Sequence, residues 1–188
     1  AMNIATTLRQ FNLNPALLSV VGQDQEGLEL IRAAELLDLN TSYLYRSADL
    51  PTDQYMAIEG NNEMIAAIAD AHSLEAAGDK ILKPLENGQL GTREKPFEGL
   101  IALDGNLTLR LLAQIANSPL FSKSDLRIAP ASPGKAERLL PLLGHKGATL
   151  YVNLEEAELL CQQNFSDAQL AAQSLVARGS NRVLVTHG

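Results

Sequence analysis

Short apolar runs alternate with segments of helical periodicity through most of this sequence. Apolar residues at helical spacing follow the first run, at Leu28, Ile31, Leu36 and Leu37. This alternation predicts an α/β fold, in which a parallel sheet is covered by helices on both faces. The apolar runs comprise 16–21, the stretches that end at Asp104, Pro130 and Asn153, and the last run at 181–188.

The segment 41–70 interrupts the alternation. It holds three β-leaning runs, TSYLYRS, DQYMAIEG and EMIAAIAD, with no helical pattern between them. Gly60-Asn61-Asn62 separates the last two runs and is typical of a hairpin turn. We therefore expect three consecutive strands that form an antiparallel flap on a core built from 1–40 and 71–188.

The bulk composition excludes several classes of function. The formal net charge of −7 disfavours a broad nucleic-acid surface. We find no apolar tract of the roughly 18 residues that a membrane span needs, and no secretory leader at the start. The lone Cys161 predicts neither an internal disulfide nor a zinc cluster. We expect a soluble, cytoplasmic protein whose two ends cut through a larger fold.

The stretch VVGQDQEG, residues 20–27, places two glycines around Asp24. Glycine permits sharp turns and close approach of other groups, and an aspartate can hydrogen-bond to nearby amides. We therefore expect a strand end that turns into a helix. Such a turn is equally compatible with a purely structural role and with a place beside a ligand.

Polar residues follow the predicted strands. In open α/β sheets, ligands bind outside the carboxyl ends of the strands. The Asp104-Gly105-Asn106 step is either a ligand site or a simple turn. The positions that this rule selects are Asp24, Asp70, Asp104, Asn106, Asn153, Glu156 and 186–188.

Asn153 and Glu156, in YVNLEEAE, are the most informative pair. Asn at a strand end caps the next helix, and a Glu three residues later lies in the first turn of that helix. The pair suits a hydrated Mg²⁺, which keeps several waters and takes few protein ligands. It also suits a capping box, a common device in which the two residues satisfy each other's backbone amides, and the pattern alone favours this interpretation.

The order of these segments resembles that of the ribokinase-like (pfkB) family of carbohydrate and nucleoside kinases. The segments are NIATTLRQF at the start, VVGQDQEG, the flap, the Asn-x-x-Glu step and the final VLVTHG. AIADA after the flap, and Asp104-Gly105-Asn106, are most similar to segments of pseudouridine kinases. The resemblance implies an incomplete three-layer sandwich, a mostly parallel sheet between helices, with 41–70 as its small antiparallel lid.

The resemblance also implies a reaction and a set of roles. Family members transfer the terminal phosphate of ATP to a sugar hydroxyl with the help of Mg²⁺, and their lid often forms a homodimer. VVGQDQEG is similar to the family's early signature beside the sugar site. The resemblance assigns substrate binding to Asn3, Asp70, Asp104 and Asn106, and nucleotide or phosphate binding to Asn153, Glu156, Thr186 and Gly188, with Glu156 reaching Mg²⁺ through water.

The sequence departs from the family pattern at several points. It lacks the first strand with its sugar-binding aspartate, the glycine pair before Asn3, and the late Gly-Ala-Gly-Asp segment that supplies the catalytic base. AAGD at 76–79 precedes the Asn-x-x-Glu step and does not replace that segment. Tyr151-Val152 stands where the family has Lys-Pro or a similar pair, and the acidic residue expected near Ala129 is absent.

The sequence therefore predicts a fragment or truncated form of an ATP-dependent sugar or nucleoside kinase, inactive as it stands. Its expected partners are a small sugar or nucleoside and a second copy bound through the lid. The alternative is a non-catalytic remnant that acts as a binding or self-association module.

Overall fold

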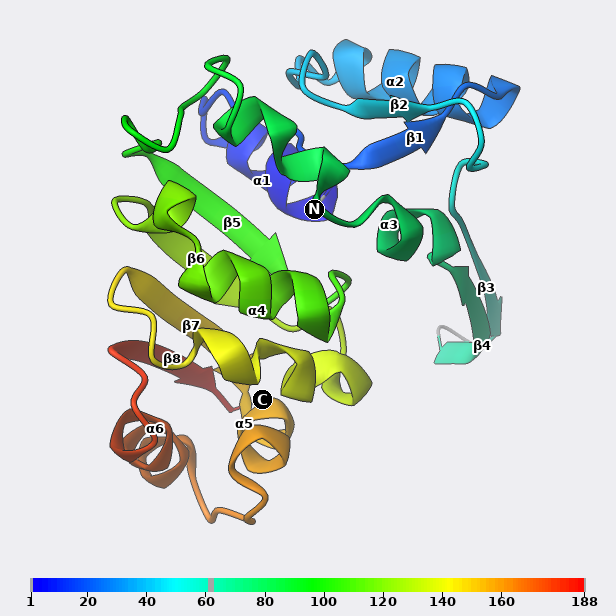
Figure 1. Cartoon of the computed structure of the whole chain (residues 1–188). Coiled ribbons are helices and arrows are strands. Elements are labelled where there is room, and N and C mark those ends of the chain that lie inside the picture. Colours follow the sequence, from blue (N-terminus) through cyan, green and yellow to red (C-terminus); the bar gives the residue numbers. More distant parts are fainter. Residues whose placement is uncertain (1, 61–62, 188) are drawn as a thin grey trace. The chain divides into compact units, whose positions relative to one another are not determined.

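The computed structural model describes residues 2–60 and 63–187. The chain divides into two compact units, residues 1–82 and 83–188. Among the described residues, no helix is long and apolar enough to cross a membrane. Each unit is an αβ structure in its own right (Figure 1).

The first unit begins with α1 (Met2–Gln10) and holds a two-stranded parallel sheet. Strand β1 (Val20–Gly22) pairs with β2 (Tyr45–Ser47), and α2 (Gln25–Leu36) lies between them in the chain. A small apolar core forms from Ala5, Leu17, Ala34 and Leu39, with Met2 and Leu44 packed against it. The predicted strand at 16–21 is shorter than expected, because only a single bridge from Ala16 to Asn40 precedes β1.

The lid is a hairpin of β3 (Gln54–Gly60) and β4 (Glu63–Asp70), paired antiparallel from Gln54 and Asp70 outward. The register shifts at a bulge between Ile58 and Glu59. The expectation of three antiparallel strands was wrong, because β2 pairs in parallel with β1. Asn61 and Asn62 of the predicted turn lie outside the described residues. The small antiparallel sheet itself is confirmed.

The chain leaves the lid through α3 (His72–Ala77) and the 3₁₀ helix η1 (Gly78–Leu85). The helical spacing of HSLEAAGDKILKPLENG, residues 72–88, predicts one continuous helix here. Gly78 instead adopts a φ of +56°, which ends α3, and Pro84 lacks the amide needed to continue an α-helix. The AAGD segment therefore forms the junction between α3 and η1.

The second unit is a four-stranded parallel sheet with the order β5-β6-β7-β8. It confirms the α/β, ribokinase-like fold class. Helix α4 packs against η3, η3 against α5, and α5 against α6 (Figure 1). The strands are β5 (Leu100–Asp104), β6 (Asp125–Ala129), β7 (Ala148–Asn153) and β8 (Arg182–Thr186); the helices are α4 (Leu109–Asn117), η2 (Pro119–Phe121), η3 (Pro133–Leu142), α5 (Leu154–Cys161) and α6 (Ala168–Ala177).

The core of the second unit lies between the sheet and these helices. Leu126 and Ile128 of β6 are buried on this face, together with Leu112, Ile115 and Leu139. The sequence SPGKAERLLPLL, residues 132–143, predicts a helix with a proline near its start, and the structure has the 3₁₀ helix η3 here, with Pro141 inside it. The sequence offers Ser166 or Asp167 as the cap of the last helix, and the structure shows Asp167 in this role, since it accepts a hydrogen bond from the Leu170 amide.

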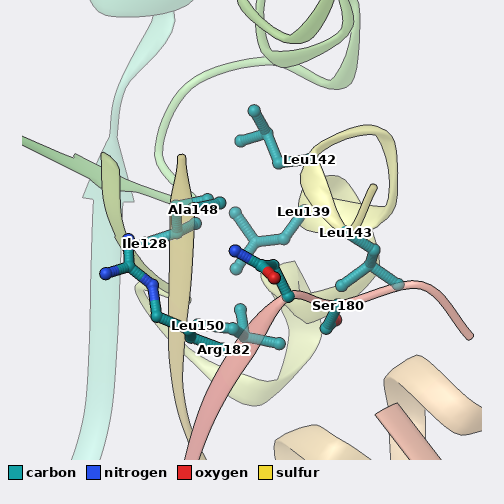
Figure 2. Close-up of a pocket in the computed structure, with 9 residues that line it drawn as sticks. Ile128, Leu139, Leu142, Leu143, Ala148, Leu150, Ser180 and Arg182 are labelled. Atoms are coloured by element: carbon teal, nitrogen blue, oxygen red, sulfur yellow. The ribbon is translucent and has the colours of Figure 1, made fainter. Parts of the chain in front are cut away.

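A cavity of about 10 Å³, roughly the size of one water molecule, lies between η3 and the sheet. Figure 2 shows Leu139, Leu142 and Leu143 of this region facing Ala148 and Leu150. The Ser180 hydroxyl is buried here and has no hydrogen-bond partner among the described residues. The cavity adjoins the amino ends of β7 and β8, and its size makes it a packing defect rather than a substrate pocket.

Candidate functional site

The carboxyl ends of the four parallel strands lie along one edge of the second unit. Asp104 pairs in register with Ala129 at the ends of β5 and β6, and Asn153 pairs with Thr186 at the ends of β7 and β8. Of the residues predicted to bind ligand, Asp104, Asn106, Asn153, Glu156 and Thr186 therefore belong to this edge. Gly188 lies outside the described residues.

The Asp104-Gly105-Asn106 step forms a tight turn after β5. The carboxylate of Asp104 accepts a hydrogen bond from the Asn106 amide at 2.9 Å. A side chain on Gly105 would approach the backbone of Ala131 and Lys135 to within 3.1 and 3.2 Å, so a glycine fits best here. The turn thus belongs to the carboxyl edge of the sheet, and it places Asn106 at this edge.

A lysine that the sequence analysis missed completes this turn. Nζ of Lys135, on η3, donates to Oδ1 of Asn106 at 2.6 Å. Arg138, one turn later, donates to the carbonyl oxygens of Asn106 and Leu107 at 3.3 and 3.4 Å. Two cations therefore flank the turn at the carboxyl end of β5. The only signal in the sequence was their helical spacing after Pro133, which does not indicate what they face.

Asn153 and Glu156 form a complete capping box at the start of α5. The Asn153 side chain accepts from the Glu156 amide at 2.8 Å, and the Glu156 carboxylate accepts from the Asn153 amide at 2.9 Å. Glu156 is buried, with 9 % exposure. The capping interpretation of the pair is confirmed. A further role in holding Mg²⁺ stays a prediction.

Two of the residues predicted to bind substrate lie in the first unit. Asn3 is exposed on α1, and its carbonyl oxygen accepts from the Thr7 hydroxyl. Asp70 ends β4 and accepts from both the amide and Nδ1 of His72, at 3.2 and 2.6 Å. The bond from His72 lowers the pKa of Asp70, and the same pair raises the pKa of His72. The roles of Asn3 and Asp70 in substrate binding stay predictions.

Asp24 organises the turn that its two glycines flank. Its carboxylate caps α2 by accepting from the Gly27 amide at 2.9 Å, and it accepts from the amide and hydroxyl of Thr52 at 2.7 and 2.5 Å. A side chain on Gly22 would approach the Thr52 nitrogen to 2.8 Å. The Thr52 hydroxyl, followed by the other bonds, lowers the pKa of Asp24. The glycines therefore make room for this carboxylate and its partners.

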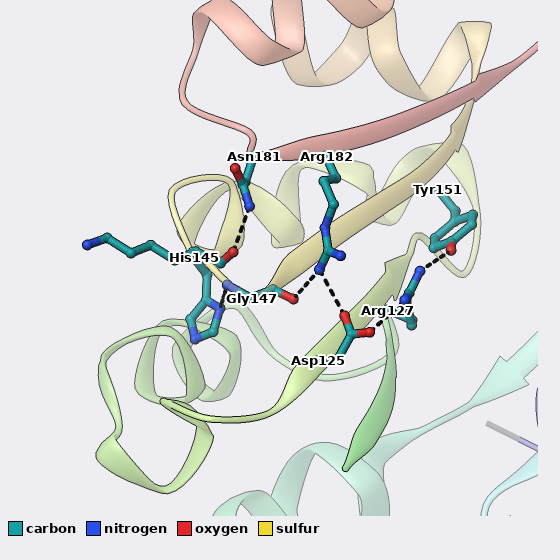
Figure 3. A network of polar contacts seen from close by, with 8 residues as sticks. Asp125, Arg127, His145, Gly147, Tyr151, Asn181 and Arg182 are labelled. Carbon is teal, nitrogen blue, oxygen red and sulfur yellow. Dashed lines mark hydrogen bonds and ion pairs between the residues drawn. The ribbon is translucent and has the colours of Figure 1, made fainter. Parts of the chain in front are cut away.

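The amino ends of the strands in the second unit carry a different polar network (Figure 3). The Asp125 carboxylate accepts hydrogen bonds from Arg127 at 2.6 Å and from Arg182 at 2.9 Å. Arg127 also donates to the Tyr151 hydroxyl at 2.8 Å. Thr149 pairs in register with Arg127 on one side and Arg182 on the other. Because the network joins side chains of β6, β7 and β8 to one another, we interpret it as structural.

The fold and the edge together define a class of protein. A parallel αβ sheet with polar residues at the carboxyl ends of its strands is an open α/β sheet, and such sheets bind their ligands at that edge. A family model described as pfkB family carbohydrate kinase matches residues 1–188. The chain belongs to the pfkB family of carbohydrate kinases.

Individual relatives agree with this assignment. The chain is 28 % identical over 188 residues to an uncharacterized sugar kinase, YeiI, of Escherichia coli K12, covering 97 % of this chain and 49 % of that protein. It thus spans about half the length of that relative. A carbohydrate kinase from Agrobacterium tumefaciens is similar over 100 % of this chain and 58 % of its own, with 22 % identity and a TM-score of 0.77.

A ribokinase from Arabidopsis thaliana, solved with ribose and ATP, has the same fold. It matches 100 % of this chain and 59 % of its own length at 15 % identity, with a TM-score of 0.70. At these identities the structural matches establish the fold, and the family model establishes the family.

The residues at the sheet edge can be tested against the ligands that the family implies. Among the described residues, no group of three or more His, Cys, Asp or Glu could hold a metal ion directly. A carboxylate such as that of Glu156 suits hydrated Mg²⁺, which keeps several waters and takes few protein ligands. Lys135 supplies a cation of the kind that pairs with phosphate oxygens.

Proposed function

We propose that this chain is part of an ATP-dependent sugar or nucleoside kinase, with pseudouridine as its most favoured substrate. One observation supports the proposal above the others: the carboxyl edge of the β5-β8 sheet carries Asn106 bonded to Lys135, together with the Asn153–Glu156 capping box. Pseudouridine rests on the sequence resemblance of 67–71 and 104–106. Because ATP is a cytoplasmic metabolite, the proposed reaction also assigns the chain to the cytoplasm.

The proposed roles follow from charge and position. Asp104 and Asn106, at the carboxyl end of β5, bind substrate hydroxyls; for Asn3 and Asp70, a role in substrate binding rests on the sequence resemblance alone. Lys135 pairs with phosphate oxygens, and Glu156 orders water around Mg²⁺, which would neutralise phosphate charge when bound. Phosphoryl transfer depends on such positioning and electrostatic stabilisation. Asn153 and Thr186, which pair at the ends of β7 and β8, contact the nucleotide.

The proposal includes the absence of turnover by this chain alone. Transfer requires a base for the acceptor hydroxyl and donors for the developing charge. Asp79 follows Gly78 at the start of η1, in the first unit. We assign no base among the residues of the sheet edge, so we expect ligand binding without catalysis.

The proposed function is tested by titration calorimetry of the 188-residue chain. MgATP should bind, and substitution of Lys135 should weaken that binding, whereas substitution of Lys146, which is exposed at the opposite ends of the strands, should not. Pseudouridine and ribose are titrated in parallel. If MgATP, pseudouridine and ribose all release no heat on titration and leave the melting temperature of the chain unchanged, the proposed function is wrong.

We also propose that two copies associate through their lids. Met56, Ile58 and Ile68 share one face of the hairpin by their register and are 64 %, 54 % and 70 % exposed. An apolar sheet face of this kind is unusual in a monomer. A dimer buries it symmetrically. Analytical ultracentrifugation at micromolar concentration should give twice the monomer mass, and a monomer there would contradict the proposal.

A further inference from the structure

The apolar side chains of the lid make few packing contacts that could hold the hairpin in place. The large apolar side chains of β3 and β4 include Tyr55, Met56 and Ile65, which are 63 %, 64 % and 70 % exposed. The principal element that each strand contacts is the other strand of the hairpin. Hydrophobic burial therefore fixes the orientation of the lid only weakly, and the bonds at its root become decisive.

The incoming leg of the lid is tied by Asp24. Both oxygens of its carboxylate accept from Thr52, one from the amide at 2.7 Å and the other from the hydroxyl at 2.5 Å. The same hydroxyl oxygen accepts from the Gly22 amide at 3.0 Å. Thr52 lies two residues before Gln54, where β3 begins.

The outgoing leg is tied by the neighbouring aspartate. The Asp53 carboxylate accepts from the amides of Ser73 and Leu74, both at 2.9 Å, and so caps α3 from outside the helix. Ser73 is buried, with 2 % exposure. Residues 52 and 53 thus join the glycine turn to the chain that leaves the lid, across the base of the hairpin.

We infer that Asp24, Thr52 and Asp53 form a clamp that fixes the lid root, and that Asp24 is a positioning residue for Asp70. Gln54 and Asp70 are the first cross-strand pair of the hairpin, directly beyond the clamp. The clamp therefore sets where the Asp70 carboxylate lies. The inference deepens the proposed function, since Asp70 is a substrate-binding residue only within that proposal.

The clamp also limits opening at the lid root. Charge-assisted bonds resist separation of the hairpin from the turn at Asp24.

Hydrogen–deuterium exchange of the ligand-free chain tests the clamp. Thr52→Val removes the hydroxyl with little change of shape and leaves the Asp24 cap of α2 intact; Thr52→Ser keeps the hydroxyl. Exchange of amides at 52–54 and 70–74 should rise about tenfold or more in Thr52→Val, as expected for the loss of hydrogen bonds to a charged group. Thr52→Ser should remain close to the parent chain.

Asp24→Asn provides the second variant, and Asp167→Asn is its matched control. Asp167 also caps a helix, through the Leu170 amide, but belongs to α6 in the other unit. Asp24→Asn should raise exchange at the lid root, and Asp167→Asn should raise it only at the start of α6. Unchanged exchange at the root in Thr52→Val, or a uniform rise across the first unit including α1, overturns the clamp.

The exchange experiment uses no nucleotide or sugar. A failure of MgATP to bind would contradict the proposed function and leave the clamp standing. A failure of the exchange pattern would contradict the clamp and leave the binding result standing. The two ideas are therefore separable.

Discussion

Asn153 and Glu156 satisfy each other's backbone amides, at 2.8 and 2.9 Å, at the carboxyl end of the sheet. This reciprocity holds the Glu156 carboxylate at the first turn of α5. The Glu156 carboxylate can therefore act both as part of the cap and as a charged group that orders a ligand. A glutamine at this position would keep the acceptor oxygen that the cap needs but would lose the charge.

Glu156→Gln should separate these two roles. The glutamine oxygen still accepts from the Asn153 amide, so the free energy of unfolding should fall by less than about 1 kcal/mol. Loss of the charge should weaken binding of MgATP about tenfold, as for other outer-shell ligands of metals, with metal-free ATP unaffected. Urea denaturation and calorimetry give the two values. Equal loss for both forms of ATP would contradict a metal-linked role.

Removing the caps themselves should affect stability at both helices. Asn153→Ala and Asp167→Ala each remove an N-cap acceptor in the second unit, and each should lower the free energy of unfolding by about 1 kcal/mol. Only Asn153→Ala should also weaken MgATP binding. If Asp167→Ala weakens binding as much, the effect reflects general destabilisation, and Asn153 has no special place at the nucleotide.

Lys135→Met should weaken binding of ATP about tenfold or more, since a charge-assisted bond to phosphate is lost while the apolar stem of the side chain is kept. Lys146→Met is the matched control at the amino ends of the strands. The difference between the two variants should shrink at high salt. Equal affinities would show that Lys135 serves only to hold the Asn106 turn.

The sequence predicted most of the second unit correctly, because its strands are continuous apolar runs that end in recognisable caps. The sequence-based prediction was wrong where the structure depends on which distant segment a strand or side chain contacts. Tyr45–Ser47 was correctly assigned to a strand, but β propensity does not indicate whether that strand pairs with β1 or with the lid. The place of Lys135 was missed because the fold brings it to Asn106 from 29 residues away.

Asp24 should make the stability of the first unit sensitive to acid. Its pKa in the folded chain lies below the ordinary value of 3.8, chiefly because the Thr52 hydroxyl donates to it. Its contribution is therefore complete above about pH 5 and is lost as the pH falls through the ordinary value and then through the lower, folded pKa. Asp24→Asn should flatten the loss of stability in this range, measured by urea denaturation between pH 5 and 2. Parallel curves would contradict the assignment.

Ile68→Lys should convert the proposed lid dimer to a monomer. The charge would lie on the apolar face formed with Met56 and Ile58, and burying it in an interface without a partner is costly. Phe11→Lys is the control, because Phe11 is also exposed, at 74 %, but lies just after α1. Sedimentation velocity should show a monomer only for Ile68→Lys. Loss of the dimer in both variants would point to an interface other than the lid.

The chain alone should release no ADP from ATP in the presence of Mg²⁺ with pseudouridine or ribose. The acceptor hydroxyl must lose a proton while charge builds on the transferred group, and removal of even one donor to such a charge typically costs about a hundredfold in rate. Lys135 offers a cation at the sheet edge, but no base is assigned beside it. A coupled ADP-release assay measures turnover against a blank without enzyme. Turnover that disappears in Asp79→Asn would identify the 76–79 segment as catalytic and contradict the prediction that it does not replace the late Gly-Ala-Gly-Asp segment.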